Sequence, residues 1–452
     1  MNEEFSYNRQ PGLSKMRIGK PDGSPPLISI ITPFYKAWDH FTQTYLSVCN
    51  QSIPFWEWII VNDGDEEATE RLESLIGDDS RIKVILQSNA GPANARNTAL
   101  QYATASFVVP LDADDLLEPT YLECAYWTMQ AHPEAGWAYT NSVGFGASEY
   151  LWAPAFSDEL MKIQNDLTLT ACIRRSVLEK VGGFDETYKY GYEDWILWLR
   201  LMRHGFYPIH MSWYGFWYRR SATGVSVFAN KSRRTLLRQI YDEGRGIANP
   251  IVAIEYPRYT DFPHHPTLPG KAVRLDLPQR KRILFLSTGE RLPREVNGSI
   301  CFAGSEEIFT GALFLCPLTL SLRQEWEEHV NEVFDLTSFL DAECWMAFIS
   351  QYIASRNVTE VVFEDDTVQK MLSPWLYREY PHLEKGEGSG TCRDRKRPME
   401  QDEKEEIIAY YKTLLAQKIH KSKASRKEKI RGTITRSRLL LLLLRWYRYT
   451  FG

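Results

Sequence analysis

The chain has 452 residues, a formal net charge of −5 and 44% hydrophobic residues, so more than one domain with a substantial core is expected. Its seven scattered cysteines are odd in number and include no Cys-X-X-Cys, which argues against a disulfide framework or a zinc site and fits a reducing cytoplasm. The first 20 residues hold no apolar signal-peptide core and no apolar stretch reaches about 18 residues, so neither a signal peptide nor a membrane-spanning helix is expected.

Strands and helices alternate from residue 27 to residue 111. Apolar runs predict strands, and the segments between them predict helices. The expected strands are 27–32, 56–61, 82–86 and 106–111, and the expected helices are 37–51, 66–76 and 91–104. This alternation with short connections predicts a parallel sheet with right-handed crossovers, whose ligands bind at the carboxyl ends of the strands.

The fourth strand ends in three carboxylates, Asp112, Asp114 and Asp115. Asp112 and Asp114 are two residues apart and point to the same side if the extended geometry persists. Carboxylate oxygens are ligands that Mg²⁺ and Mn²⁺ prefer. A solvated acidic turn is the alternative. Asp115 is expected either to support the metal ligands or to cap a helix from Leu116 onward.

The other strand ends also carry candidate residues. Thr32, Pro33 and Tyr35 leave the first strand, where a nucleobase or ribose could pack on Tyr35. Asp63 follows the second strand, where its carboxylate could accept hydrogen bonds from a base or ribose, unless it serves an Asp-Gly turn. Arg96 lies in a first helical turn, where it would pair with Asp63 or face a diphosphate; a solvated arginine is the alternative.

Further candidates lie near the end of this region. Glu193 and Asp194 begin a helix with an apolar face, a position where acidic residues also serve as helix caps. Arg219 and Arg220 follow an aromatic strand and could clamp phosphates, with surface arginines as the alternative. The segment 144–155 is expected to form a loop or hairpin near the site.

Six short motifs occur in a specific order and spacing. They are Ile30–Tyr35, Ile59–Gly64, Asn89–Gly91 with Ala95–Asn97, Leu111–Asp115, Gly182–Asp185 and Glu193–Trp195. Through them, the chain from about residue 27 to residue 226 resembles the family 2 glycosyltransferases of the GT-A fold. The resemblance implies an α/β domain with a mostly parallel sheet that binds a nucleotide-sugar donor.

The resemblance also implies residue roles. It names Asp194 as the base that takes a proton from an acceptor hydroxyl in an inverting transfer, with Glu193 orienting the acceptor. It implies that Asp114 and Asp112 hold Mn²⁺ or Mg²⁺, a Lewis acid for the departing nucleoside diphosphate. The implied donor-binding residues are Thr32, Pro33, Tyr35, Asp63, Arg96, Asp112, Arg219 and Arg220. Two departures from the family pattern are Asn62, where relatives often have Asp, and Ser221, where they often have His.

The second half predicts a smaller α/β segment that faintly resembles one half of a GT-B-type enzyme but shows no complete donor site. Its expected strands are 281–287, 312–315 and 358–363, and its expected helices are 341–355 and 367–380. The chain is therefore expected to comprise a polar leader at 1–26, a GT-A domain at 27–246, a Pro- and His-rich linker at 247–280, a smaller α/β domain at 281–385, and a flexible break with a basic amphipathic tail at 386–452.

The tail from Lys418 onward is strongly basic, with Glu428 as its only acid, and ends in leucines beside Trp446 and Tyr447. This composition favours an anionic membrane surface, which would place a cytoplasmic protein peripherally on the inner face of the cell membrane. Packing on a partner chain is the first alternative, and nucleic-acid binding is not expected.

The sequence thus predicts a metal-dependent inverting glycosyltransferase that uses a nucleoside-diphosphate sugar and a saccharide or lipid-linked acceptor in bacterial surface polysaccharide synthesis. One alternative is a non-catalytic glycan- or nucleotide-binding scaffold that acts through its C-terminal half and tail. Another is a nucleotidyltransferase, which would usually show a Gly-rich basic loop after the first strand; Thr32–Tyr35 is not such a loop.

Overall fold

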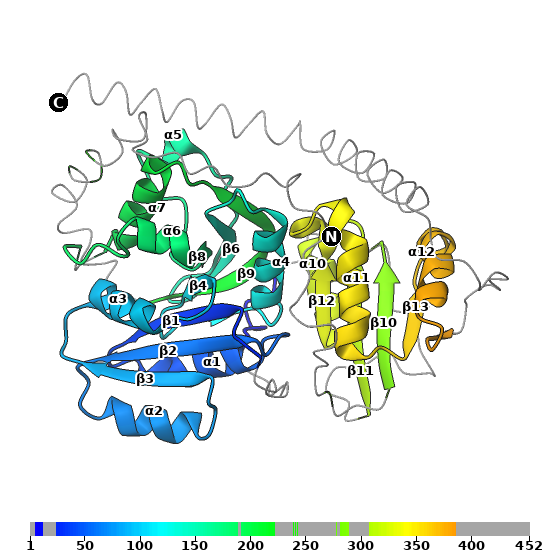
Figure 1. The fold of residues 1–452 in the computed structure, drawn as a ribbon, viewed down its shortest axis with the longest axis horizontal. Helices are drawn as coiled ribbons and strands as arrows, with labels where there is room; N and C mark the ends of the chain where they lie inside the picture. The colour runs from blue at the N-terminus through cyan, green and yellow to red at the C-terminus, as the bar shows by residue number, and fades with distance from the viewer. Residues whose placement is uncertain are drawn as a thin grey trace. The chain divides into compact units, whose positions relative to one another are not determined.

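The computed structural model (Figure 1) describes residues 5–11, 24–188, 191–221, 277, 281–288 and 307–385, together with 238, 240 and 242. The chain forms two units, Met1–Gln369 with His382–Thr391, and Lys370–Pro381 with Cys392–Gly452. The sites discussed below all lie in the first unit. The expected linker at 247–280, apart from Leu277, and the whole expected tail at 386–452 fall outside the described residues.

The larger sheet of the described chain has nine strands in the order β3-β2-β1-β4-β8-β6-β9-β5, with β7 paired to β6. The strands are β1 Ile28–Phe34, β2 Trp56–Asp63, β3 Ile82–Gln87, β4 Phe107–Pro110, β5 Leu116–Leu117, β6 Trp137–Gly146, β7 Tyr150–Trp152, β8 Cys172–Arg174 and β9 Pro208–Arg220. The helices of this part are α1 Trp38–Cys49, α2 Ala68–Ile76, α3 Pro92–Tyr102, α4 Tyr121–Ala131, α5 Asp158–Met161, α6 Arg175–Lys180 and α7 Glu193–Arg203. The predicted α/β class is confirmed.

Four strands form the parallel half that the sequence predicts. β1 lies between β2 and β4 and runs parallel to both, and β3 continues the sheet beside β2 (Figure 1). Every residue of β2 and β4 is buried, as expected for strands covered on both faces. The carboxyl ends of β1, β2 and β4 therefore meet at one edge, where Asp63 ends β2 and the acidic cluster follows β4.

The rest of the sheet is mixed, but its longest pair, β6 with β9, is also parallel, so the predicted mostly parallel sheet is confirmed. β8 runs antiparallel to β4 and β6, and β6 and β7 form an antiparallel hairpin where a loop or hairpin was expected. Leu116 and Leu117 form β5 against β9, and the next helix, α4, begins only at Tyr121. The alternative in which Asp115 caps a helix from Leu116 is therefore wrong, because both leucines pair with β9.

α7 is fixed by its apolar side. Seven of its eleven residues are buried, and Trp198 stacks on Trp137 of β6 with ring centroids 5.1 Å apart. Gly191 and Tyr192, immediately before the helix, both have positive φ, which turns the chain sharply into its first turn. Packing of the helix body thus places Glu193 and Asp194 at its partly buried start.

A second, smaller sheet confirms the predicted second α/β segment. Its strands are all parallel, in the order β12-β11-β10-β13-β14. The strands are β10 Lys281–Ser287, β11 Ile308–Phe314, β12 Glu332–Asp335, β13 Glu360–Phe363 and β14 Glu384–Lys385, with helices α10 Leu320–His329, α11 Ala342–Arg356 and α12 Asp366–Glu379 and a 3-10 helix η3 Leu336–Ser338. Across the described residues, no helix has the length and hydropathy needed to cross a membrane.

Helix α4 joins the two sheets. Nearly all of its side chains are buried, which is typical of a helix covered on every side. The Trp127 ring packs edge-on against Phe348 of α11, with centroids 5.2 Å apart, and the Thr128 hydroxyl donates to the Phe339 carbonyl. The smaller α/β segment therefore completes the packing of the larger one.

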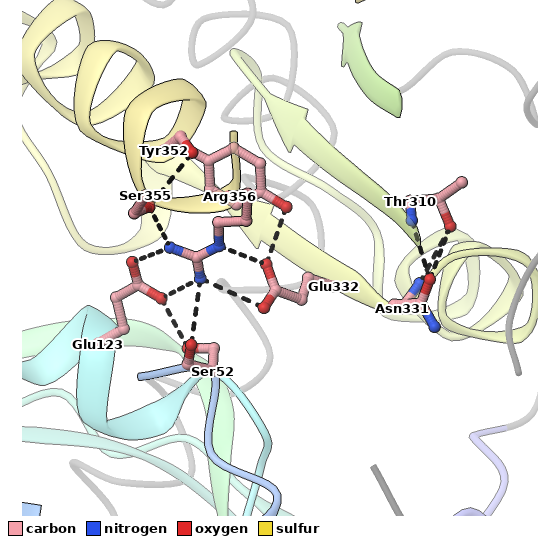
Figure 2. Close-up of polar contacts among 8 residues, drawn as sticks. All are labelled: Ser52, Glu123, Thr310, Asn331, Glu332, Tyr352, Ser355 and Arg356. Carbon is pink, nitrogen blue, oxygen red and sulfur yellow. Dashed lines mark hydrogen bonds and ion pairs between the residues drawn. The ribbon is translucent and has the colours of Figure 1, made fainter. Parts of the chain in front are cut away.

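A buried ionic cluster lies at the same contact (Figure 2). Arg356, the last residue of α11, has no exposed surface and donates two hydrogen bonds to each of Glu123 and Glu332. Glu123 belongs to α4 and also accepts from the Ser52 hydroxyl, while Glu332 begins β12 and accepts from the Tyr352 hydroxyl. The Arg356 guanidinium thus links the two sheets, and both of its carboxylate partners accept further hydrogen bonds from hydroxyl groups.

Part of the expected polar leader is packed. Phe5 lies against Trp217 of β9 with ring centroids 5.8 Å apart. Ser6 exchanges backbone hydrogen bonds with the Gln324 side chain of α10, and Arg9 pairs with Glu328. Residues 5–11 therefore contact both α/β segments.

We expect Arg356→Ala to lower the free energy of unfolding by about 3–5 kcal/mol, because it leaves two buried carboxylates without their cation. The matched control is Arg175→Ala, which removes a half-exposed pair with Glu179 and should cost at most about 1 kcal/mol. Urea denaturation measures both. Equal losses for the two variants would contradict the structural importance of the buried cluster.

Candidate active site

Arg96 is the centre of the site. It lies on α3 with 2% of its side chain exposed, and it donates to Asp112 Oδ1 at 2.5 Å and to Glu193 Oε1 at 3.0 Å. Burial lowers the pKa of Arg96, but the two carboxylates outweigh it and the net pKa is raised. Arg96 therefore pairs with Asp112 and Glu193, and the expected pairing with Asp63 is wrong.

The remaining carboxylates of the acidic cluster differ in their surroundings. Burial, and next the charge of Asp112, raises the pKa of Asp114 to about 6, and no described side chain hydrogen-bonds its carboxylate. Asp115 is buried and accepts the Arg219 backbone N–H at 2.7 Å, and burial raises its pKa well above the ordinary value. The charge of Asp112 thus disfavours the ionised forms of both Asp114 and Asp115.

The two arginines of β9 do different things. Arg219 donates through Nε to the Asp114 carbonyl at 2.8 Å and through Nη2 to Gln43 of α1 at 2.7 Å, and its guanidinium lies 4.3 Å from the Phe145 ring centroid. It therefore braces the acidic loop. Arg220 lies 5.1 Å from the Tyr218 ring centroid and lines a cavity.

Asp194 stands at the start of α7. Its Oδ1 accepts the Trp195 backbone N–H at 2.7 Å, and its Oδ2 accepts from Nδ2 of Asn165 at 2.8 Å. Burial, and next the charge of Glu193, raises its pKa to about 7, while the two hydrogen bonds act in the opposite direction. The carboxylate is thus half protonated near neutral pH and is held at both oxygens.

Asp63, the last residue of β2, binds the loop that follows β3. Its buried carboxylate accepts from the backbone N–H groups of Ala90 and Gly91 and from the Gln87 amide, all at 2.8–2.9 Å. These bonds fix the loop between β3 and α3, which is far along the chain from the Asp-Gly turn at residues 63–64, and the donor-binding role of Asp63 stays a prediction. Asn62, the departure from the family pattern, closes a turn through Asp65.

The candidates after β1 divide between the core and the surface. Thr32 is fully buried, and its hydroxyl accepts from the Trp58 indole at 2.8 Å. Pro33 precedes Phe34 within the strand, whereas Tyr35 is 49% exposed beside Lys36. Of these candidates, Tyr35 has the accessible ring that base stacking requires.

A cavity of about 530 Å³ opens next to Asn165. The hairpin of β6 and β7 supplies Ser142, Tyr150 and Trp152, and Trp152 is 41% exposed. The hairpin also supplies Ser148 and Leu151. The remaining lining residues come from the loop before β8 and from β9; they are Asn165, Asp166, Leu167, Thr168, Tyr218 and Arg220. Aromatic rings with hydroxyl and amide groups are suited to a sugar.

Sequence reasoning missed Asn165, Gln43 and Tyr218. None of them has a motif that marks it, because each reaches the site through a fold contact with a residue far along the chain. The polar loop 164–168 before the apolar run at Leu169 was the one available signal for Asn165.

We expect Asp63→Asn to destabilise the fold by about 1–3 kcal/mol, because an amide presents one acceptor oxygen to three buried donors. Asp65→Asn, on the same turn but with one long hydrogen bond at 3.4 Å, should stay within about 0.5 kcal/mol of the parent. Chemical denaturation compares the two. An Asp63→Asn variant of parental stability that loses nucleotide binding would instead assign the carboxylate to the ligand.

Comparisons with known proteins find relatives of the larger α/β segment, which carries this site. A family model described as "Glycosyl transferase family 2" matches residues 29–182. The chain is 34% identical over 189 residues to the putative teichuronic acid biosynthesis glycosyltransferase TuaG of Bacillus subtilis, across 40% of this chain and 74% of TuaG. It is 30% identical over 237 residues to Escherichia coli WfgD, named UDP-Glc:alpha-D-GlcNAc-diphosphoundecaprenol beta-1,3-glucosyltransferase, across 51% of this chain and 90% of WfgD.

Among solved structures, S. aureus TarS 1-349 in complex with UDP-GlcNAc is 20% identical, with a TM-score of 0.42, over 50% of this chain and 67% of that chain. The sequence relatives decide the assignment, because TuaG and WfgD are each matched at 30% identity or more over most of their own length. The chain belongs to the family 2 glycosyl transferases, and the relatives named here for teichuronic acid and for a diphosphoundecaprenol acceptor belong to bacterial surface polysaccharide synthesis.

Proposed function

We propose that the chain is a metal-dependent, inverting glycosyltransferase that moves a sugar from a nucleoside-diphosphate donor to a saccharide or lipid-linked acceptor of a bacterial surface polysaccharide. The observation that carries this proposal is the Arg96 bridge between Asp112 and Glu193. Through it, one buried cation couples the acids that face the leaving diphosphate to the helix start that carries Asp194.

Asp114 and Asp112 would hold the Mn²⁺ or Mg²⁺ ion. The cluster fits a divalent cation because the charge of Asp112 raises the pKa of both Asp114 and Asp115, and the Asp114 carboxylate has no described side-chain partner. The ion would neutralise the charge that grows on the departing diphosphate. Since no three His, Cys, Asp or Glu side chains group as a metal site in the described residues, water and diphosphate oxygens would complete the ligand set.

Asp194 acts as the general base. The acceptor hydroxyl attacks the anomeric carbon from the face opposite the diphosphate, a carbon–oxygen bond forms, and the bond to the phosphate oxygen breaks. The hydroxyl proton passes to Asp194, and the nucleoside diphosphate leaves with the bonding electrons. A base with a pKa near 7 combines a substantial deprotonated fraction at neutral pH with enough basicity to accept the proton.

The acceptor occupies the cavity beside Asn165. Trp152 and Tyr218 offer ring faces for a sugar, and Ser142 and Thr168 offer hydroxyl groups. Arg220, which also lines the cavity, is the better of the two β9 arginines for a phosphate, because Arg219 is already engaged by the Asp114 carbonyl and Gln43. WfgD is named for an acceptor that carries a diphosphate, which supports this assignment.

We expect Asp114→Asn to abolish the Mn²⁺-dependent binding of UDP and to reduce turnover, because it removes a metal-ligand oxygen charge. Asp194→Asn should keep UDP binding but lose about 10²–10⁴-fold in turnover, the usual contribution of a general base. Calorimetry with UDP, with and without Mn²⁺, and UDP release from UDP-sugars measure the two effects, and the exposed Asp39→Asn is the control. No UDP binding by the folded parent protein would favour the scaffold alternative.

The rate of UDP release should rise with pH and reach half of its maximum near pH 7. The sign follows from the raised pKa of Asp194, since the protonated form that predominates below this pH cannot accept the acceptor proton. The pH profile at saturating donor and Mn²⁺ tests this. A rate that is flat from pH 5 to 8.5 would exclude Asp194 as the titrating base.

A further inference from the structure

We propose that Asn165, which lines the acceptor cavity, is a positioning residue for Asp194 and holds one oxygen of the base in place. This inference rests on the proposed role of Asp194 as the base. Asn165 lies 29 residues before Asp194 along the chain, on the loop that follows α5.

Asn165 is itself held by its loop. Its Oδ1 accepts the Leu167 backbone N–H at 3.2 Å, which fixes the amide plane and leaves Nδ2 to donate to Asp194 Oδ2 at 2.8 Å. Leu167 is buried in the core that also contains Trp195 and Met161, and the Trp195 indole donates to the Met161 carbonyl at 2.6 Å. The loop and the start of α7 are therefore packed together, and the amide cannot turn away from the base without breaking its own turn.

The two hydrogen bonds to Asp194 hold different oxygens of its carboxylate. The Trp195 N–H holds Oδ1 along the helix, while Asn165 holds Oδ2 from the side of the cavity. A carboxylate oxygen can accept more than one hydrogen bond, so Oδ2 retains a site for the acceptor hydroxyl. A fixed carboxylate loses less orientational freedom in the transition state.

The other groups around Asp194 act on its ionisation in opposite directions, so the hydrogen bond from Asn165 affects its pKa. Glu193 on the same helix opposes its ionisation, while Arg96 of α3 favours it. Tyr218 of β9 faces the same group, and its own pKa is raised by burial and by the nearby acids. Against burial and Glu193, the Asn165 amide is one of the few groups that stabilise the ionised base.

The test follows the ionisation of Asp194 directly. The Asp194 carboxyl signal is isolated by infrared difference spectroscopy as the band lost in Asp194→Asn, and it is titrated in the full-length protein. Asn165→Ala should raise the midpoint by about one pH unit, because a hydrogen bond to a charged group is lost. Asn165→Asp should raise it further, because it adds a like charge. Gln164→Ala, whose side chain donates to Asp166 instead, should leave it unchanged.

Turnover supplies the second measurement, as UDP release from a UDP-sugar with Mn²⁺. Asn165→Ala should lower kcat about tenfold and shift its pH profile upward in parallel, with the KM for donor unchanged. Unaltered midpoint and kcat in folded Asn165→Ala would overturn the inference while leaving the base assignment intact, as would a lower kcat with an unmoved midpoint. Full turnover in Asp194→Asn would instead overturn the proposed function, whatever Asn165→Ala does.

Discussion

The site depends on one buried guanidinium. Arg96 comes from α3 in the parallel half of the larger sheet, and its two carboxylate partners come from a strand end and from α7. A cation with this little exposure is tolerable only because both partners are charged and close. Its planar group has donors in a fixed fork, so the partners must take up a set geometry. Packing places the start of α7, and Arg96 adds an electrostatic link between this helix start and the acidic cluster.

The acidic side chains at this edge of the sheet differ in hydrogen bonding and in pKa because their surroundings differ. Asp63 accepts hydrogen bonds from the loop between β3 and α3, and Asp112 is paired with Arg96. Asp114 and Asp194 have raised pKa values because burial and like charges disfavour their ionised forms. Similar side chains thereby take different surroundings, from loop binding at Asp63 to charge pairing at Asp112, and the proposed function assigns cation binding and proton transfer to the two with raised pKa values.

Much of this could be predicted from the sequence, for identifiable reasons. The strands ending at Asp63 and Pro110 are apolar on both faces, and the second α/β segment shows the same alternation, so both were expected. The antiparallel β5 was missed because two leucines before a helix carry no strand period. Three sets of contacts could not be predicted from the sequence: those of Arg96, Arg219 and Asn165. Each joins residues that are separated by at least 16 positions and meet only in the tertiary fold.

The burial of α4 also limits which fragments of this protein keep their core covered. The family match ends at residue 182, which invites isolation of the first α/β segment as a smaller catalytic fragment. Such a fragment would bring the Glu123 carboxylate into water without Arg356 and would uncover the Trp127 ring that Phe348 now covers. A newly exposed aromatic patch promotes self-association. A fragment that keeps both contacts therefore extends at least through α11, so its minimum length is set by burial and not by sequence similarity.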